Sequence, residues 1–436
     1  MQTSTLPIKT LSDLINHAHS PFHCSSYCME KLRAEGFHEL SLNEPFQLSP
    51  GKKYVINLYD ASCMAFTIGK KVSSSGQFPI LRMLTSHTDW PTFLIKPRPE
   101  SVCEQYGRLN VEPYGGALYT SWLDRPLGLA GKVCIKAKNS FHPQTVLVDS
   151  ERSVGIIPGL AIHMNWEAND GSKLNPQLHM LPLVSLGDQK DFFPAYLAGL
   201  AKCLPEDILD YEICLYNADE GCETGFSKEF FSSPRIDNCS SVQAALEAVI
   251  NSDMEENLIC VSAFYHNEEI GSTTKQGAAS VLTRQLFERI FENLGFKKEA
   301  LYCALAEGLC LSLDVAHGMH PAYPDKNDPT NHVCLGDGVA IKLSARQSYA
   351  TDSSYVSIIQ ALCEEYHIPY SKYVNRSDIR GGSTLGSISS TKLGIPCVDA
   401  GVPLLSMHSA RELMACSDQT ALCRLAKAVF QNSQNF

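Results

Sequence analysis

Two adjacent carboxylates, Glu268 and Glu269, stand where an apolar run ends. Residues 258–264 have the composition of a buried strand, and α/β sheets place their ligand sites at the C-terminal ends of strands. Adjacent acids repel each other, so a divalent cation would compensate them there. One carboxylate could bind the ion while its neighbour moves a proton of the water that the ion activates. Two solvated acids in a loop would give the same pattern, so the choice between these two interpretations depends on the rest of the chain.

Other acids and histidines also lie at the ends of predicted elements. His87 follows a strand at 80–85, Asp314 one at 308–313 and His408 one at 395–399, while Asp237 precedes a helix at 240–250. Parallel strands bring their C-terminal ends to one edge, where these residues can converge. The set suits two divalent ions of zinc type. Asp237 would bridge the ions, His87 and Glu269 or Asp314 would bind one each, and His408 would complete the second. Glu268 would be the general base.

Each motif taken alone has a simpler explanation. His87 can be a loop histidine beside an N-capping Asp89, although Asp89 can also fix the tautomer of a metal-binding His87 from outside the ligand shell. Asp237 can be an ordinary acid at a helix N-terminus. His163 and His179 can be histidines that are satisfied within their own strands.

The elements that carry these residues form two parts of the chain. Residues 1–89 and 233–436 alternate between helical and strand patterns, which predicts one discontinuous α/β domain. Residues 90–232 have short β-type runs with frequent Gly and Pro, which predicts an inserted, mostly β domain. Ser20 and Pro21 are predicted as the N-cap and first residue of a helix, and residues 274–294 are predicted as one long helix.

The composition excludes several classes of protein. Of 436 residues, 44% are hydrophobic and 19% are charged, which is an ordinary globular balance. The net charge of -11 and the lack of a basic block argue against a nucleic-acid partner. The 17 cysteines form no C-x-x-C pair, so we expect reduced thiols and a metal site built from His and carboxylates. With no signal-peptide layout and no apolar run of membrane-spanning length, we expect a cytoplasmic protein without a membrane partner.

Five motifs in order resemble the M18 metallopeptidases, the aspartyl aminopeptidase family. They are HTD (87–89), PRIDN (234–238), NEEIGS (267–272), LDVAHGMHPAYPDK (313–326) and SMHS (406–409). Two further stretches support the resemblance, YGGALYTSWLDRPLGLAGKV (114–133) and GGSTLG (381–386). The resemblance covers nearly the whole chain.

The resemblance implies a fold and a role for each matching residue. The fold would be a three-layer α/β zinc-peptidase core with an inserted, mostly β dimerisation domain, and the family builds tetrahedral dodecamers from dimers. The implied roles are zinc ligands for His87, Asp237 (bridging), Glu269, Asp314 and His408, general base for Glu268, and substrate contacts for His317, Lys342 and Tyr349. His179 resembles the histidine that the inserted domain delivers to a partner subunit's site.

The resemblance also implies a substrate class. Lys342 would pair with an acidic N-terminal side chain, so the expected activity is removal of N-terminal Asp or Glu from peptides. A neutral preference of the Leu or Ala type is the alternative, since Lys342 could make a structural ion pair instead. Cobalt or manganese could replace zinc. More distant alternatives are a deacylase or carboxypeptidase on the same core, and a non-catalytic scaffold or cargo relative.

Overall fold

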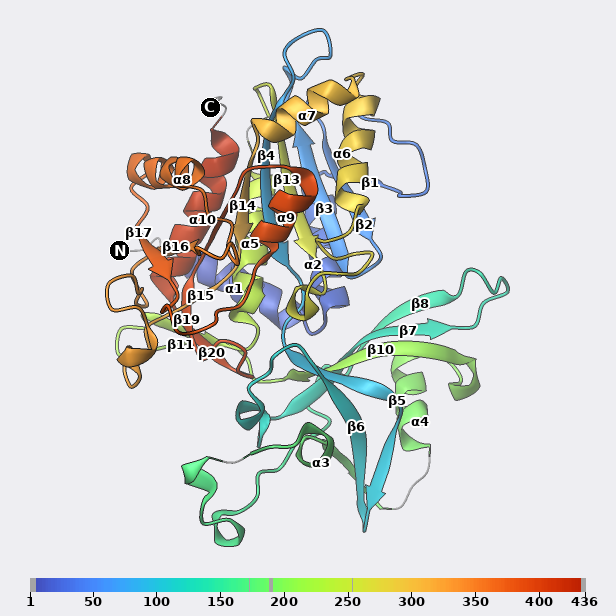
Figure 1. Ribbon diagram of the computed structural model, residues 1–436. Coiled ribbons are helices and arrows are strands. Elements are labelled where there is room, and N and C mark those ends of the chain that lie inside the picture. The colour runs from blue at the N-terminus through green and yellow to red at the C-terminus, as the bar shows by residue number, and fades with distance from the viewer. Residues whose placement is uncertain (1–4, 172, 188–190, 253, 433–436) are drawn as a thin grey trace.

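A mixed nine-stranded sheet forms the centre of the α/β part of the molecule (Figure 1). The computed structural model describes residues 5–171, 173–187, 191–252 and 254–432. In spatial order the strands are β1 (His38–Leu40), β2 (Lys53–Leu58), β3 (Ser62–Ile68), β13 (Leu258–Tyr265), β4 (Ile80–His87), β14 (Leu309–Leu313), β18 (Cys397–Gly401), β16 (Val339–Leu343) and β17 (Tyr370–Val374).

The middle of this sheet is parallel, which brings the C-terminal ends of its strands to the same edge. β13, β4, β14 and β18 are parallel neighbours. All residues of β13, β14 and β18 are buried, as expected for parallel strands that helices cover on both faces. The C-terminal ends of β4, β13 and β14 therefore lie side by side at one edge.

Helices cover both faces of the sheet, which gives three layers. One apolar cluster joins the sheet to α1 (Thr5–His17), α2 (Pro21–Ala34), α5 (Ile236–Ile250), α8 (Ser353–Glu365) and α10 (Cys416–Gln431). A second cluster on the other face holds α6 (Leu282–Asn293), α7 (Lys298–Ala306) and α9 (Leu385–Leu393). Alternate residues of β13 belong to the two clusters, with Cys260 in the first and Val261 in the second. None of the described helices is long and apolar enough to span a membrane.

A six-stranded antiparallel sheet projects from this core, drawn in blue-green to green in Figure 1. Its order is β8 (Gln144–Asp149), β7 (Leu127–Ile135), β10 (Ile208–Asn217), β5 (Thr92–Cys103), β6 (Tyr106–Tyr114) and β9 (Leu183–Leu186), and it carries α3 (Pro176–His179) and α4 (Phe192–Ala201). It has its own core, which includes Phe93, Trp122 and Phe193. The predicted fold class, an α/β core with a β-rich insertion, is confirmed.

A third, small sheet joins the end of the insertion to later segments of the α/β part. It contains β11 (Cys222–Thr224), β12 (Phe230–Ser233), β20 (Glu412–Ala415), β19 (Pro403–Leu405) and β15 (Ala316–His317). β12 pairs with β20, so the chain just before Asp237 runs beside the chain just after His408. The short 3-10 turns are η1 (Tyr119–Trp122), η2 (Ile162–Met164), η3 (Ala168–Asp170), η4 (Pro205–Asp207), η5 (Glu268–Ile270) and η6 (Pro324–Lys326).

Two helix boundaries test the sequence predictions. The Ser20 side chain accepts a hydrogen bond from the His23 N–H with Pro21 as the first residue of α2, which confirms that cap. The predicted helix at 274–294 is wrong in its first part, because α6 begins only at Leu282. Before it, Thr274 and Gln276 donate side-chain hydrogen bonds to Asn267 Oδ1, and these bonds fold the segment back onto the preceding loop instead of into a helical turn. The segment forms turns that hold the loop carrying Glu268 and Glu269.

Candidate active site

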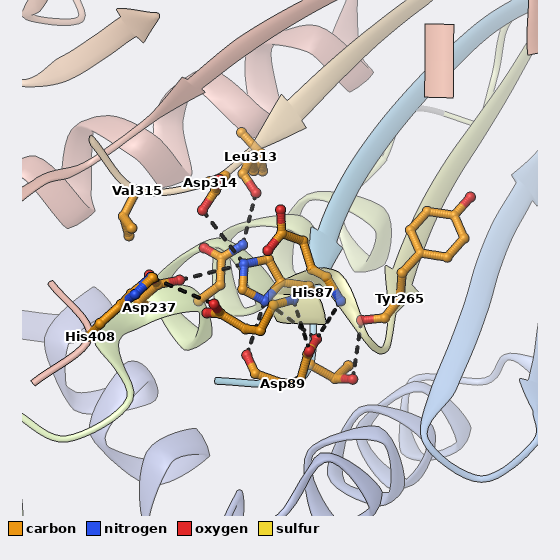
Figure 2. Close-up of polar contacts among 12 residues, drawn as sticks. His87, Asp89, Asp237, Tyr265, Leu313, Asp314, Val315 and His408 are labelled. Atoms are coloured by element: carbon orange, nitrogen blue, oxygen red, sulfur yellow. Dashed lines mark hydrogen bonds and ion pairs between the residues drawn. The ribbon is translucent and has the colours of Figure 1, made fainter. Parts of the chain in front are cut away.

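His87 ends β4 and is fixed in one tautomer (Figure 2). Its Nδ1 donates to the backbone carbonyl of Asp89 at 3.0 Å, because a carbonyl can only accept. The Nε2 lone pair is thereby left free. Nε2 lies 3.5 Å from Asp237 Oδ1 and 3.6 Å from Asp314 Oδ1, so His87 presents a ligand atom toward two carboxylates. The side chain is 1% exposed.

His408 mirrors this arrangement from the other side. Its Nδ1 donates to the carbonyl of Gly116 at 3.1 Å, and its Nε2 lies 3.4 Å from Asp237 Oδ2 and 3.6 Å from Glu269 Oε2. Asp237 thus points one oxygen at each imidazole (Figure 2). The backbone carbonyls that accept these hydrogen bonds set both rings in the orientation that a metal-binding histidine needs.

Asp89 organises the loop of the two adjacent acids. Its carboxylate accepts the backbone N–H of Glu268 and of Glu269, each at 3.2 Å, and the Tyr114 hydroxyl at 2.6 Å. Burial opposes ionisation of Asp89, but His87 and the Tyr114 hydroxyl are among the neighbours that lower its pKa to about 2. The negative charge is therefore kept, and it holds the loop at the end of β13.

Asp314 follows β14 and pairs with a buried lysine. Its Oδ2 lies 3.2 Å from Lys342 Nζ, and the same ammonium donates to the Val315 carbonyl at 3.0 Å. Burial alone would raise the pKa of Asp314, but Lys342 and His87 hold it below its ordinary value. Lys342 also lies 5.0 Å from the centre of the Tyr349 ring.

The remaining carboxylates are crowded and resist ionisation. Burial raises the pKa of Glu268 to about 8, and Asp314, Asp89 and Asp237 add to the shift. Burial, followed by the charge of Asp237, also raises the pKa of Glu269 well above its ordinary value. A cation placed among these groups would reverse both effects.

The residues present fit a pair of metal ions. His87, Asp237 and Asp314 form one group whose ligand atoms lie within 4.8 Å of one another, and Asp237, Glu269 and His408 form a second. Glu268 joins a third such group with His87 and Glu269. Within the described residues, the buried Asp237 Oδ1 accepts no hydrogen bond, which is unusual unless an ion uses it. Imidazole and carboxylate donors of this kind suit zinc.

A cleft of about 420 Å³ collects nearly all the predicted site residues. Its lining includes His87, Asp237, Glu268, Glu269, Asp314, His317, Lys342, Tyr349 and His408. Asp89 lies behind it, in contact with the loop of the two acids. His179 does not line this cleft. It lies at the end of α3 on the six-stranded part, where its Nδ1 accepts the Asn175 N–H at 2.9 Å.

Three supporting residues were not predicted for these roles. Glu412 is buried and accepts the backbone N–H of Asp237 at 3.0 Å and of His408 at 2.9 Å, so it fixes two site residues at once. Tyr114 and Gly116 lie in a stretch noted only as a supporting motif. The one sequence signal for Glu412 is an acid four residues after His408, which periodicity cannot distinguish from a surface acid.

All 17 cysteines are free thiols, and none lines the cleft.

A three-layer α/β core with imidazoles and carboxylates converging at strand ends defines a metal-dependent hydrolase. The family described as Aminopeptidase I zinc metalloprotease (M18) matches residues 14–430. The chain therefore belongs to the M18 family of zinc metallopeptidases, and the predicted family and enzyme class are confirmed.

Individual relatives agree with this assignment. The chain is 40% identical to the probable M18 family aminopeptidase 2 of Clostridium acetobutylicum over 415 residues, covering 94% of this chain and 95% of the relative. It is similar to the Ape4 structure solved as a complex with Nbr1, with a TM-score of 0.93 at 30% identity, covering 99% of this chain and 86% of that one. The yeast (S. cerevisiae) mApe1 dodecamer gives a TM-score of 0.85 at 25% identity, with coverage of 99% and 97%.

The crowded acids predict how stability depends on pH when metal is removed. Burial raises the pKa of Glu268 and Glu412 from 4.5 to about 8, so between these values the folded chain keeps protons that the unfolded chain has released. Unfolding then releases protons, and stability falls as pH rises. The loss for each such group is about 1.4 kcal/mol per pH unit at most. His408, raised from 6.5 to about 10 chiefly by Asp237 and Glu269 against the effect of burial, acts in the same direction above pH 6.5.

We expect the melting temperature of chelated protein to fall between pH 6 and 8, and zinc-reloaded protein to show a flatter curve. Differential scanning fluorimetry on both forms of one preparation measures the difference, and groups outside the site cancel. Parallel curves for the two forms would contradict this account.

Proposed function

We propose that the protein is a dinuclear zinc aminopeptidase that removes N-terminal residues from peptides. The observation that carries the proposal is the pair of ligand groups that share Asp237, each with one histidine and one further carboxylate. His87 and Asp314 would complete one zinc site, and Glu269 and His408 the other. Cobalt or manganese would fit the same oxygen and nitrogen donors.

Glu268 is suited to proton transfer because it lines the cleft without belonging to either pair. The chemistry that the ions supply when bound is Lewis acidity, which lowers the pKa of water and stabilises charge on the amide oxygen. Glu268 takes a proton from the attacking water and returns it to the leaving amine. His317, in the wall of the cleft, donates to the amide oxygen as negative charge develops there. The acids of the cleft hold the substrate's free α-amine and favour N-terminal cleavage.

Substitution of the base tests the mechanism. Glu268→Gln keeps the shape of the side chain but removes proton transfer, so we expect activity to fall by about 10²–10⁴ with zinc content unchanged. Zinc is measured by mass spectrometry on the assayed sample. Glu292→Gln, an exposed glutamate on α6, is the control and should keep full activity. Activity of Glu268→Gln within a factor of a few of the unsubstituted protein would reject the assignment.

We propose a preference for acidic N-terminal residues, with Lys342 and Tyr349 in the wall that receives the side chain. Lys342 offers a cation inside the cleft, and a carboxylate would form a charge-assisted bond with it. A neutral preference of the Leu or Ala type is the second candidate. The ion pair between Lys342 and Asp314 favours that candidate, because it leaves less charge for the substrate.

A substrate panel separates the two candidates. Nitroanilides of Asp, Glu, Leu, Ala and Lys are compared with their N-acetylated forms, with and without a chelator. We expect Asp and Glu to be cleaved best, the acetylated forms to be resistant and the chelator to abolish activity. Best cleavage of Leu or Ala would discard the acidic preference and keep the mechanism. Cleavage of acetylated substrates would indicate a deacylase instead.

We propose that the chain forms dimers through an inserted domain at 90–232, and that dimers assemble into a tetrahedral dodecamer. An apolar patch supports the proposal: Leu160, Met164, Trp166 and Leu178 are 60%, 74%, 72% and 65% exposed. Large apolar side chains that are exposed close together in the sequence are typical of protein contacts. His179 would then reach the cleft of a partner subunit, and the similar S. cerevisiae mApe1 is a dodecamer.

Charge placed in this patch tests the assembly. Met164→Asp combined with Trp166→Asp should shift the species from a dodecamer to smaller forms in light scattering after size exclusion, because the acids cannot be buried unpaired at an apolar contact. Val281→Asp, which replaces an apolar residue that is 66% exposed on the core, serves as the control. An unchanged dodecamer in the double variant would show that the patch is not an interface.

A further inference from the structure

A second cleft adjoins the candidate active site. It measures about 650 Å³ and lies between the segments 343–348 and 374–383. Gly382 and Ser383 line both clefts, so these two residues form the partition. A Cβ at Gly382 would meet no atom within 4 Å, so the space beside this glycine is open. Because the two clefts share these lining residues, a peptide bound in the active site has the second cleft as its direct neighbour.

This second cleft is basic. Arg346, Arg376 and Arg380 line it, and its lining contains no Asp or Glu. Arg376 is partly committed, since its Nε lies 2.7 Å from Asp378 Oδ1 and it also donates to the Asp325 carbonyl. In the described part of the chain, the guanidinium groups of Arg346 and Arg380 pair with no carboxylate. A chain with a net charge of -11 thus concentrates unpaired positive charge beside its active site.

The lysine inside the first cleft is in the opposite situation. Lys342 Nζ bonds to Asp314 and to the Val315 carbonyl, and Asp399 is a further negative neighbour that helps to raise its pKa against the effect of burial. Lys342 therefore shares its positive charge with Asp314 before a substrate binds. A substrate carboxylate that reaches past Gly382 meets cations in the basic cleft that no carboxylate of the described residues pairs.

We propose that the basic cleft is a carboxylate-binding subsite for the peptide substrate, with Arg346 and Arg380 as the residues that select acidic peptides. The inference rests on the proposed aminopeptidase function and names the substrate class of that same site. Arginine forms paired hydrogen bonds with a carboxylate in a fixed geometry, and the Ser383 hydroxyl in the same wall provides a further donor.

The carboxylate has three possible sources in a peptide. It can be the N-terminal side chain, an acidic residue at the second or third position, or the free C-terminus of a short peptide. Successive residues of an extended peptide are about 3.5 Å apart, so each source places its charge at a different distance from the metal ligands. One set of peptides distinguishes them.

The test compares cleavage of five tetrapeptides by the zinc-loaded protein: amidated Leu-Ala-Ala-Ala as the neutral parent, the same peptide with a free C-terminus, and amidated forms with Glu at position one, two or three. We expect at least one acidic peptide to exceed the parent about tenfold in kcat/KM, as a charge-assisted contact gives. In Arg346→Ala combined with Arg380→Ala that ratio should fall to near one. The double lysine variant should retain part of it. Arg98→Ala, an exposed arginine on β5, should keep the full ratio.

Binding provides a readout that does not depend on turnover. Calorimetry on zinc-loaded Glu268→Gln, with and without the two arginine-to-alanine substitutions, measures the affinity for the preferred acidic peptide. Tenfold weaker binding without the arginines supports the subsite even if no peptide is cleaved, a result that would overturn only the proposed activity. Cleavage with no preference for acidic peptides, or a preference that survives in the double alanine variant, overturns the subsite and leaves the aminopeptidase assignment intact.

Discussion

Repulsion among buried carboxylates is the constraint on which this structure depends. Asp237, Glu268, Glu269 and Asp314 converge on one cleft together with three imidazoles and one lysine. Such a set is unfavourable unless positive charge enters it, and the geometry leaves an oxygen of Asp237 without a hydrogen bond. The side chains of a second set of acids, Asp89 and Glu412, accept backbone N–H groups instead. The acids of the cleft therefore remain available to cations, while Asp89 and Glu412 already have hydrogen-bond partners in the backbone.

The two sheets supply the site from different directions. β4, β13 and β14 bring His87, Glu268 and Asp314 to the edge of the parallel sheet. The small sheet pairs β12 with β20 and so brings Asp237 and His408 to the same place. Glu412 lies in β20, and its side chain binds the backbone N–H groups of both residues. The pairing of β12 with β20 therefore also positions Asp237 and His408.

The sequence was most informative where a pattern of residues is compatible with few local structures. An apolar run followed by acids predicted the ends of β13 and β14, because buried parallel strands have no other common composition. The helix before Leu282 was mispredicted since side-chain bonds to Asn267, a long-range property of the folded loop, replaced helical ones. Glu412 was missed because a buried acid and a surface acid look alike in sequence. Lys342 was noted as a cation, but its partner Asp314 is 28 residues away in the chain.

The segment Tyr114-Gly115-Gly116 belongs to the end of the six-stranded sheet and yet touches the candidate metal centre. Tyr114 binds Asp89, and Gly116 orients the ring of His408. Gly115 has a φ of +69°, and a Cβ there would lie 3.1 Å from Glu269 Cβ, so the approach needs glycine. Movement of the six-stranded part would therefore turn the ring of His408, a proposed metal ligand. A contact that fixes the position of the six-stranded part would then change the affinity of the site for ions. By thermodynamic reciprocity, ion binding would change the freedom of the six-stranded part to move.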